Sequence, residues 1–231
     1  MKYFLLLFAS CVLASCQTRM NIQGTTDVAL LEGKMLYLRA FAVDDLTTLD
    51  SARVTHGRFH FTGSAPDSTV FASLFIEDES VMPVVLDNHP LTVTLNENER
   101  RVVGSELNDS LCAFIRRKTS IDRQLAELPR RESRMILEGM DHDEILMQLN
   151  REASLLSDEN AALVTRFIKS NMDNVLGPGV FMVVTSGFPY PVLNPQIEEL
   201  ITLASPFFLN DAYVREYVRI ARENMERMSE E

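Results

Sequence analysis

The sequence predicts an α+β fold in which an N-terminal antiparallel β-sandwich of about eight short strands precedes an α-helical subdomain. Two observations carry this prediction. From residue 19 to residue 103, apolar side chains alternate with polar ones or form short β-branched runs between turn residues. After Gly104 the apolar period changes to about 3.6 residues. We therefore place a domain boundary at this glycine, with a β-sandwich domain over 16–104 and a helical subdomain over 105–231.

Turn residues separate the predicted strands at regular spacing, which is typical of a small β-sandwich. In one of them, Leu36 and Leu38 share one face and Tyr37 and Arg39 the other. Between two others, Gly57 supplies the positive φ that a tight hairpin requires. The predicted strands cover residues 20–24, 34–41, 46–54, 58–61, 69–76, 81–86, 91–95 and 100–103.

The first predicted helix follows the last strand directly. Ser105 is its expected N-cap, and Pro129, which lacks a backbone N–H, is its expected end. Its apolar residues form one stripe at helical spacing. They are Leu107, Leu111, Phe114, Ile115, Ile121, Leu125 and Leu128.

Four more helices are expected. One covers about 133–156, and the next runs over 157–170 with two acidic residues in its first turn, where the helix dipole favours them. Asn194-Pro195 and Asn210 begin the last two. The strands and helices together predict one sandwich with helices packed on each other and against it.

The N-terminal residues have the pattern of a signal peptide. Lys2 precedes an apolar run that is shorter than the roughly 20 residues needed to span a bilayer. The four residues 13–16 (LASC) resemble the lipobox of bacterial lipoproteins, in which the cysteine sulfur receives a diacylglyceryl group. This resemblance implies cleavage between Ser15 and Cys16, loss of 1–15 and a lipid anchor on Cys16. The alternative is a plain secretory signal that contains a cysteine by chance.

Composition excludes several classes of protein. With 46% hydrophobic and 24% charged residues, the chain is neither a disordered nor a collagen-like protein, and three cysteines are too few for a disulfide scaffold. The net charge of −11 argues against a nucleic-acid binder, which needs clustered Lys and Arg. We expect no nucleic-acid partner.

Six short motifs carry a family resemblance. They lie at 49–54 (LDSARV), 57–63 (GRFHFTG), 84–86 (VVL), 91–93 (LTV), 104–109 (GSELND) and 167–177 (FIKSNMDNVLG). They resemble the uncharacterised lipoprotein module, a domain of unknown function, that precedes thioredoxin-like (AhpC/TSA) domains in Bacteroidetes, here without the thioredoxin-like domain. The resemblance implies no catalytic residue. No acidic run follows Cys16, and in lipoproteins of that phylum such a run accompanies surface display, so we expect the outer membrane, facing the periplasm.

The cysteines exclude one kind of chemistry. A dithiol oxidoreductase needs an attacking and a resolving thiol, often as Cys-x-x-Cys. Once the signal peptide is removed, only Cys16 and Cys112 remain, and Cys16 would carry lipid. Cys112 lies on an apolar helix face, where we expect a buried, inert thiol rather than a reactive one.

Three polar clusters contain residue types that could bind a cation. His56 and His60 lack a third ligand, the run 141–144 (DHDE) places neighbouring residues on different sides of a helix, and 77–79 (EDE) lacks a calcium loop. We interpret them as solvated strand residues, a charged helix start and a polar turn. We expect no metal and no cofactor.

One loop is a candidate contact surface. In 186–191 (SGFPYP), Phe188 and Tyr190 alternate with prolines, so they could form a rigid binding lip. The alternative is a connector that places both rings in the core. The chain contains no Gly-x-Ser-x-Gly elbow and no phosphate-binding glycine loop.

Two hypotheses of function follow. The first is a non-catalytic envelope lipoprotein that binds a protein partner or a small ligand at the membrane surface, with an apolar patch or groove where the two halves meet. The second is a truncated accessory of a thioredoxin-like envelope redox or stress pathway. Neither hypothesis makes the chain an enzyme.

Overall fold

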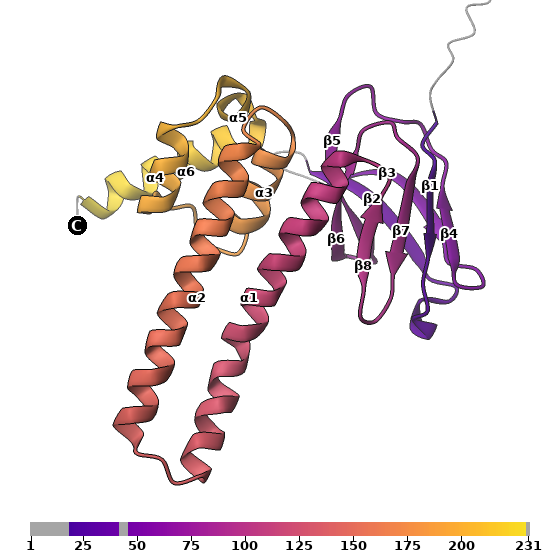
Figure 1. The fold of residues 1–231 in the computed structure, drawn as a ribbon. Coiled ribbons are helices and arrows are strands. Elements are labelled where there is room, and N and C mark those ends of the chain that lie inside the picture. Colours follow the sequence, from indigo (N-terminus) through magenta and orange to yellow (C-terminus); the bar gives the residue numbers. More distant parts are fainter. Residues whose placement is uncertain (1–18, 42–45, 230–231) are drawn as a thin grey trace, which may run out of the picture.

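Two four-stranded sheets face each other in the N-terminal half of the protein (Figure 1). The structure is a computed structural model, and it describes residues 19–41 and 46–229. The predicted signal peptide, its cleavage site at Ser15 and the lipid attachment at Cys16 lie outside these residues. The strands are β1 (Ile22–Thr25), β2 (Met35–Phe41), β3 (Leu46–Arg53), β4 (Arg58–Phe61), β5 (Val70–Ile76), β6 (Glu79–Leu86), β7 (Leu91–Leu95) and β8 (Arg100–Val103).

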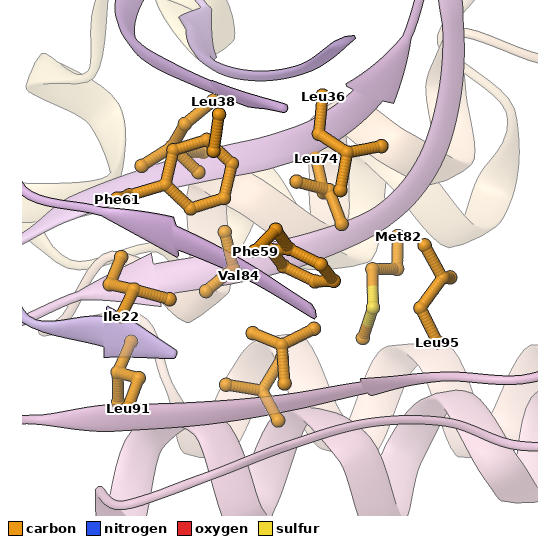
Figure 2. Close-up of a cluster of buried hydrophobic side chains, with 14 of the residues drawn as sticks. Ile22, Leu36, Leu38, Phe59, Phe61, Leu74, Met82, Val84, Leu91 and Leu95 are labelled. Carbon is orange, nitrogen blue, oxygen red and sulfur yellow. The ribbon is translucent and has the colours of Figure 1, made fainter. Parts of the chain in front are cut away.

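The strand order is β4-β1-β7-β8 in one sheet and β3-β2-β5-β6 in the other. Neighbouring strands pair antiparallel except β1 and β7, which pair parallel. The apolar residues of alternating strand positions meet between the sheets, where Leu36 and Leu38 face Phe59 and Phe61 (Figure 2). The predicted sandwich is confirmed.

The β3–β4 hairpin turns at His56 and Gly57, which have φ values of 52° and 68°. Two successive residues with positive φ are typical of the tight turns that join antiparallel strands. The Glu32 carboxylate accepts hydrogen bonds from the backbone N–H groups of His56 (2.9 Å) and Gly57 (3.1 Å). These bonds favour the charged form and lower the pKa of Glu32.

The α-helices follow the last strand without a linker, whereas one short 3-10 helix lies between β1 and β2, and the predicted α+β fold class is confirmed. Ser105 caps the first helix by accepting a hydrogen bond from the Asn108 N–H, as predicted. The helices are η1 (Ala29–Leu31), α1 (Glu106–Leu137), α2 (His142–Ser170), α3 (Leu176–Thr185), α4 (Pro195–Thr202), α5 (Pro206–Asn210) and α6 (Ala212–Ser229). No helix within the described residues has the length and apolar character needed to cross a membrane.

Three predicted helix ends are wrong. No helix begins at about 133, because α1 continues to Leu137 and a turn at Gly139 (φ 79°) precedes α2, which begins at His142. Pro129 lies inside α1 with its own side chain exposed, because packing of Leu128 beside it into the α1–α2 seam offsets the missing hydrogen bond. The break predicted at 156–157 does not exist, because the buried stripe of α2 continues from Leu149 through Leu156 to Val164. No glycine or proline interrupts the chain there.

Three helical segments were not predicted from the sequence, namely α3 and the much shorter α5 and η1. α3 is buried on almost every side, so it has no polar face and shows no helical period. It lies between the sandwich and the remaining helices, whereas the distal parts of α1 and α2 project as a hairpin (Figure 1). Phe71 of β5 and Val85 of β6 point away from the sandwich interior and belong to the core formed by the helices. The sheet β3-β2-β5-β6 is therefore covered on both faces along β5 and β6.

Candidate functional site

Asn108 fixes the helices to the edge of the sandwich. Its side chain is fully buried and accepts a hydrogen bond from the Val85 N–H (2.9 Å) while donating one to the Val85 carbonyl (2.8 Å). It also donates to the Ser105 hydroxyl (2.9 Å). Since β6 is an edge strand, these bonds satisfy backbone groups that would otherwise be buried without partners.

A glycine brings α3 close to the sheet. A Cβ added at Gly179 would lie 2.3 Å from the nearest ring atom of Phe71, which is far inside van der Waals contact. The ring of Phe71 therefore occupies the space that any larger residue would need. This close approach explains a glycine in a helix interior, where it costs about 1 kcal/mol relative to alanine.

An apolar groove of about 220 Å³ opens beside this contact, between the sheet and the helices. We call it the junction groove. The sheet contributes four residues from the end of β2 and the start of β5, and α3, α5 and α6 supply the opposite wall. It is lined by Phe41, Thr69, Val70, Phe71, Val175, Pro178, Gly179, Met182, Phe207, Asp211, Ala212 and Tyr213.

Two phenyl rings of the junction groove remain exposed to solvent. Phe41 on the sheet side is 37% exposed and Phe207 on the helix side is 48% exposed. Tyr213 in the same wall is held by a 3.0 Å hydrogen bond between its hydroxyl and Thr185. Phe181 packs edge-on against Tyr213 with ring centroids 6.4 Å apart, so a rigid aromatic cluster supports this wall.

The lining of the junction groove suits binding more than acid–base chemistry. Asp211 is the one ionisable carboxylate among its described lining residues, and it accepts a 3.1 Å hydrogen bond from the Val214 N–H at the start of α6. The volume is below the roughly 300–1,000 Å³ of sites that take drug-sized ligands. A single apolar side chain or a small molecule of similar size fits such a space.

A second, wider depression of about 760 Å³ lies between α2 and α4. Its charged lining is partly neutralised internally, because Lys169 and Glu199 form a 2.8 Å ion pair. Gln196 donates to the Ala161 carbonyl and to the Thr165 hydroxyl. These bonds join α4 to α2, so we treat the depression as a packing seam.

The predicted binding lip lies outside both spaces. Phe188 is partly buried against the helical core, and Tyr190 is 49% exposed. Tyr217 of α6 holds the loop, since its hydroxyl accepts from the Val192 N–H and donates to the Val192 carbonyl, each at 3.1 Å. Burial raises the pKa of Tyr217. The role of Phe188 and Tyr190 as a contact surface stays a prediction.

Cys112 is partly buried and packs against the sandwich core. Its sulfur is 3.4 Å from both the N–H and the carbonyl oxygen of Val102. Among the described residues it is the one free cysteine, so no dithiol pair lies in this part of the chain.

The polar clusters take structural positions, although His56 lies in the β3–β4 turn and not in a strand as predicted. The Asp141 carboxylate accepts from the N–H groups of Asp143 (3.0 Å) and Glu144 (3.1 Å), which caps α2. His60 contacts the Asn21 side chain at 3.2 Å, and Glu77 pairs with Lys34 at 2.8 Å. Within the described ranges, no group of three or more His, Cys, Asp or Glu side chains could hold a metal ion.

The residues of the junction groove were not singled out from the sequence. Two signals were present. Phe207 and Phe208 are adjacent in a helix, so both rings cannot enter the same core, and Phe208 is the buried one. Gly177 and Gly179 in an apolar segment indicate a close backbone approach.

One comparison with known proteins gives a match, over the N-terminal part of the chain. No curated protein and no solved structure matches it significantly. Residues 20–111 match the family model described as "Domain of unknown function (DUF4369)". The match covers all eight strands and ends in α1 just after Asn108, so it includes the residue that closes the β6 edge. The sandwich and the first turns of α1 are thus similar to this family of unknown function, in agreement with the predicted resemblance to an uncharacterised module.

Proposed function

We propose that this protein is a non-catalytic binding module of the bacterial cell envelope, and that its junction groove receives an apolar side chain of a protein partner. The observation that carries the proposal is the pair of exposed rings, Phe41 and Phe207, on opposite sides of the groove. Most phenyl rings in a folded protein are buried, and aromatic residues around a pocket are the usual anchors of protein interfaces.

The size and chemistry of the groove support a protein partner over a cofactor. About 220 Å³ with mainly apolar walls accommodates one side chain, which is how hot-spot residues enter a partner's surface. The Tyr213 hydroxyl is already bonded to Thr185, and Asp211 caps α6. Few polar groups are left to orient a small polar ligand.

The proposed location rests on the N-terminal sequence. The lipobox-like residues 13–16 support cleavage after Ser15 and a lipid anchor on Cys16. Two or more acyl chains anchor a protein stably, because each buried methylene contributes about 0.8 kcal/mol. We place the protein on the outer membrane, facing the periplasm, with only a few residues between the anchor and β1.

Affinity purification from cross-linked envelope membranes tests this proposal. The bait is the full chain, and the test variants are Phe207→Ala and the groove-filling Thr69→Trp. Leu203→Ala is the matched control, because Leu203 is 54% exposed and lies outside the groove lining. We expect both groove variants to lose the partner that the wild type and the control retain, and Cys16→Ala to leave the membrane fraction.

Equal recovery of the partner by all variants would show that the groove is not the binding surface. A chain that fractionates without lipid would contradict the proposed anchor. The identity of the partner separates the two hypotheses of function: a thioredoxin-like protein supports the redox-accessory role, and any other envelope protein supports a general binding module. Turnover of an envelope substrate by the purified chain would contradict a non-catalytic role.

A further inference from the structure

A small polar cavity of about 100 Å³ lies at the end of the sandwich where the chain enters β1 (Figure 1). We call it the entry cavity. Residues 19–22, 65–66 and 86–91 form its walls. The chemistry of this space differs from that of the junction groove, because five of its twelve lining residues are charged or polar. They are Arg19, Asn21, Asp87, Asn88 and His89.

Strand pairing holds the walls of the entry cavity in place. β1 and β7 pair parallel with Ile22 opposite Leu91, so the segments that precede the two strands lie side by side. The Leu91 N–H donates to the Asn21 carbonyl, and the Met20 N–H donates to the Gly63 carbonyl, each at 2.9 Å. These bonds hold three segments that are distant in the sequence around one space.

One wall of the entry cavity contains a buried carboxylate. The side chain of Asp87 is only 9% exposed, and its Oδ1 atom has no hydrogen-bond partner among the described residues. His89 Nδ1 lies 3.2 Å from this oxygen, but the two groups are not aligned for a hydrogen bond. Burying an anion without a partner is unfavourable, and most buried polar atoms in native proteins are satisfied. The carboxylate therefore indicates a missing cationic donor.

The same cavity also contains a cation without a partner. Arg19 is exposed, and within the described part of the chain its guanidinium forms no ion pair, with Asp87 or with any other carboxylate. A simple cation would be repelled by Arg19 and a simple anion by Asp87. A ligand that carries one positive and one negative group can interact favourably with both.

The volume limits the size of the ligand. About 100 Å³ is far below the roughly 300–1,000 Å³ of sites that take drug-sized molecules, so only a group of a few heavy atoms can enter. A primary ammonium has three N–H donors, which suits the unpartnered oxygen of Asp87. The anionic group of the ligand then lies at the mouth of the cavity, where Arg19 is exposed. The His89 side chain beside Asp87 is 64% exposed, so a ligand can displace it without disturbing the core.

The position of the cavity in the chain indicates where such a ligand is found. Only Gln17 and Thr18 separate Arg19 from Cys16. An extended chain spans at most roughly 3.6 Å per residue, so the two ends of this link are at most roughly 11 Å apart. A lipid anchor on Cys16 would therefore hold the entry cavity close to the headgroup layer of the membrane. This step rests on the anchor put forward under the proposed function.

We propose that the entry cavity binds a phosphoethanolamine group, with the ammonium at Asp87 and the phosphate at Arg19. This group joins one primary ammonium to one phosphate through two carbons, and it is the headgroup of phosphatidylethanolamine. Binding holds this end of the sandwich against the membrane and adds a second contact to the anchor. Because the anchor already keeps the cavity at the surface, a weak affinity is sufficient to keep it occupied.

The charges favour this headgroup over others. Anionic headgroups have no ammonium for Asp87, and the net charge of −11 opposes binding to an anionic surface. A choline headgroup has a trimethylammonium, which is larger and has no N–H to donate. A free amino acid carries the same two charges as phosphoethanolamine, so it is the other source of this chemistry.

NMR titration of the full chain in non-ionic detergent with glycerophosphoethanolamine tests the proposal. The amide signals of Asn88 and His89 should shift and reach saturation. Asp87→Asn, which keeps the size of the side chain, and Arg19→Gln should each raise the dissociation constant at least roughly tenfold, because each removes one charge that binds the probe. Glycerophosphocholine should bind at least roughly tenfold more weakly. Glu97→Gln is the matched control, since Glu97 is exposed beyond the opposite end of β7, and it should bind as the wild type does.

Two further arms separate the sources of the ligand. In the first, the full chain is anchored in phosphatidylcholine nanodiscs, and the signals of Asn88 and His89 should take their bound positions only when phosphatidylethanolamine is present. In the second, glycine replaces the probe and should bind more weakly than glycerophosphoethanolamine. Tighter binding of glycine would assign the cavity to free amino acids and overturn the headgroup assignment.

The outcomes also separate this proposal from the proposed anchor. The titration uses a soluble probe, so a chain that leaves the nanodiscs would contradict the anchor and leave the titration result valid. No shift at millimolar glycerophosphoethanolamine, or equal shifts in Asp87→Asn and the wild type, would overturn the proposal. Circular dichroism should show the same fold in all variants, and Arg19→Gln, which changes an exposed side chain, keeps the test valid if Asp87→Asn does not fold.

Discussion

Replacing Asn108 with alanine tests how the helices are joined to the sandwich. The substitution removes the partners of the Val85 N–H and the Val85 carbonyl, both of which Asn108 now satisfies inside the protein. An unsatisfied buried backbone group costs about 1–3 kcal/mol. Because the removed amide no longer has to be desolvated, we expect a net loss of about 2–4 kcal/mol in the free energy of unfolding.

Urea unfolding followed by circular dichroism measures this loss, and hydrogen exchange at the Val85 amide reports on the broken bond directly. Asn150→Ala is the control, since Asn150 is exposed on α2, and we expect a change within about 0.5 kcal/mol. A loss below about 0.5 kcal/mol for Asn108→Ala, together with an unchanged exchange rate at Val85, would refute the reasoning.

Three further changes have defined outcomes. Gly179→Ala forces a Cβ against the Phe71 ring and should cost about 1–3 kcal/mol in urea unfolding, with partial rescue by a second change, Phe71→Ala. Because the pKa of Glu32 is lowered in the folded protein, its carboxylate stabilises the fold above the ordinary value of 4.5, and this contribution is lost as the pH falls through the lower folded-state pKa. Glu32→Gln should therefore flatten the pH dependence of the melting temperature between 4.5 and that lower pKa, and an unchanged profile would contradict the role of the carboxylate. Pro129→Ala restores a donor to the Leu125 carbonyl and should raise stability by about 1–3 kcal/mol, whereas a loss would show that the proline shapes α1.

The sandwich could be predicted because alternation is a local property. Leu36 and Leu38 point inward and Tyr37 and Arg39 outward in both the sequence pattern and the structure. Gly57 marked the hairpin for a similar reason, since only a few residues adopt its φ easily. Both signals can be recognised from a few neighbouring residues, without the rest of the sequence.

The ends of the helices and the existence of α3 depend on tertiary contacts, which cannot be recognised in the sequence. Pro129 predicted an end, but packing of Leu128 in the seam with α2 outweighs the missing hydrogen bond. α3 was not predicted because it is buried on nearly all sides. It therefore has no polar face, and without one the sequence shows no helical period. The junction groove combines Phe41 with Phe207, which are 166 residues apart, so its existence follows only from how the sheet and the helices pack.

The proposed binding role is tested most directly by photo-cross-linking in living cells. Benzoyl-phenylalanine replaces Phe41 or Phe207 in the groove, or Leu30, which is 85% exposed outside it. The proposal predicts that both groove positions form an adduct with the same envelope protein, that Ala212→Trp at the groove wall abolishes the adduct, and that position 30 forms none. Adducts of equal yield at position 30, or none at either groove position, would contradict it.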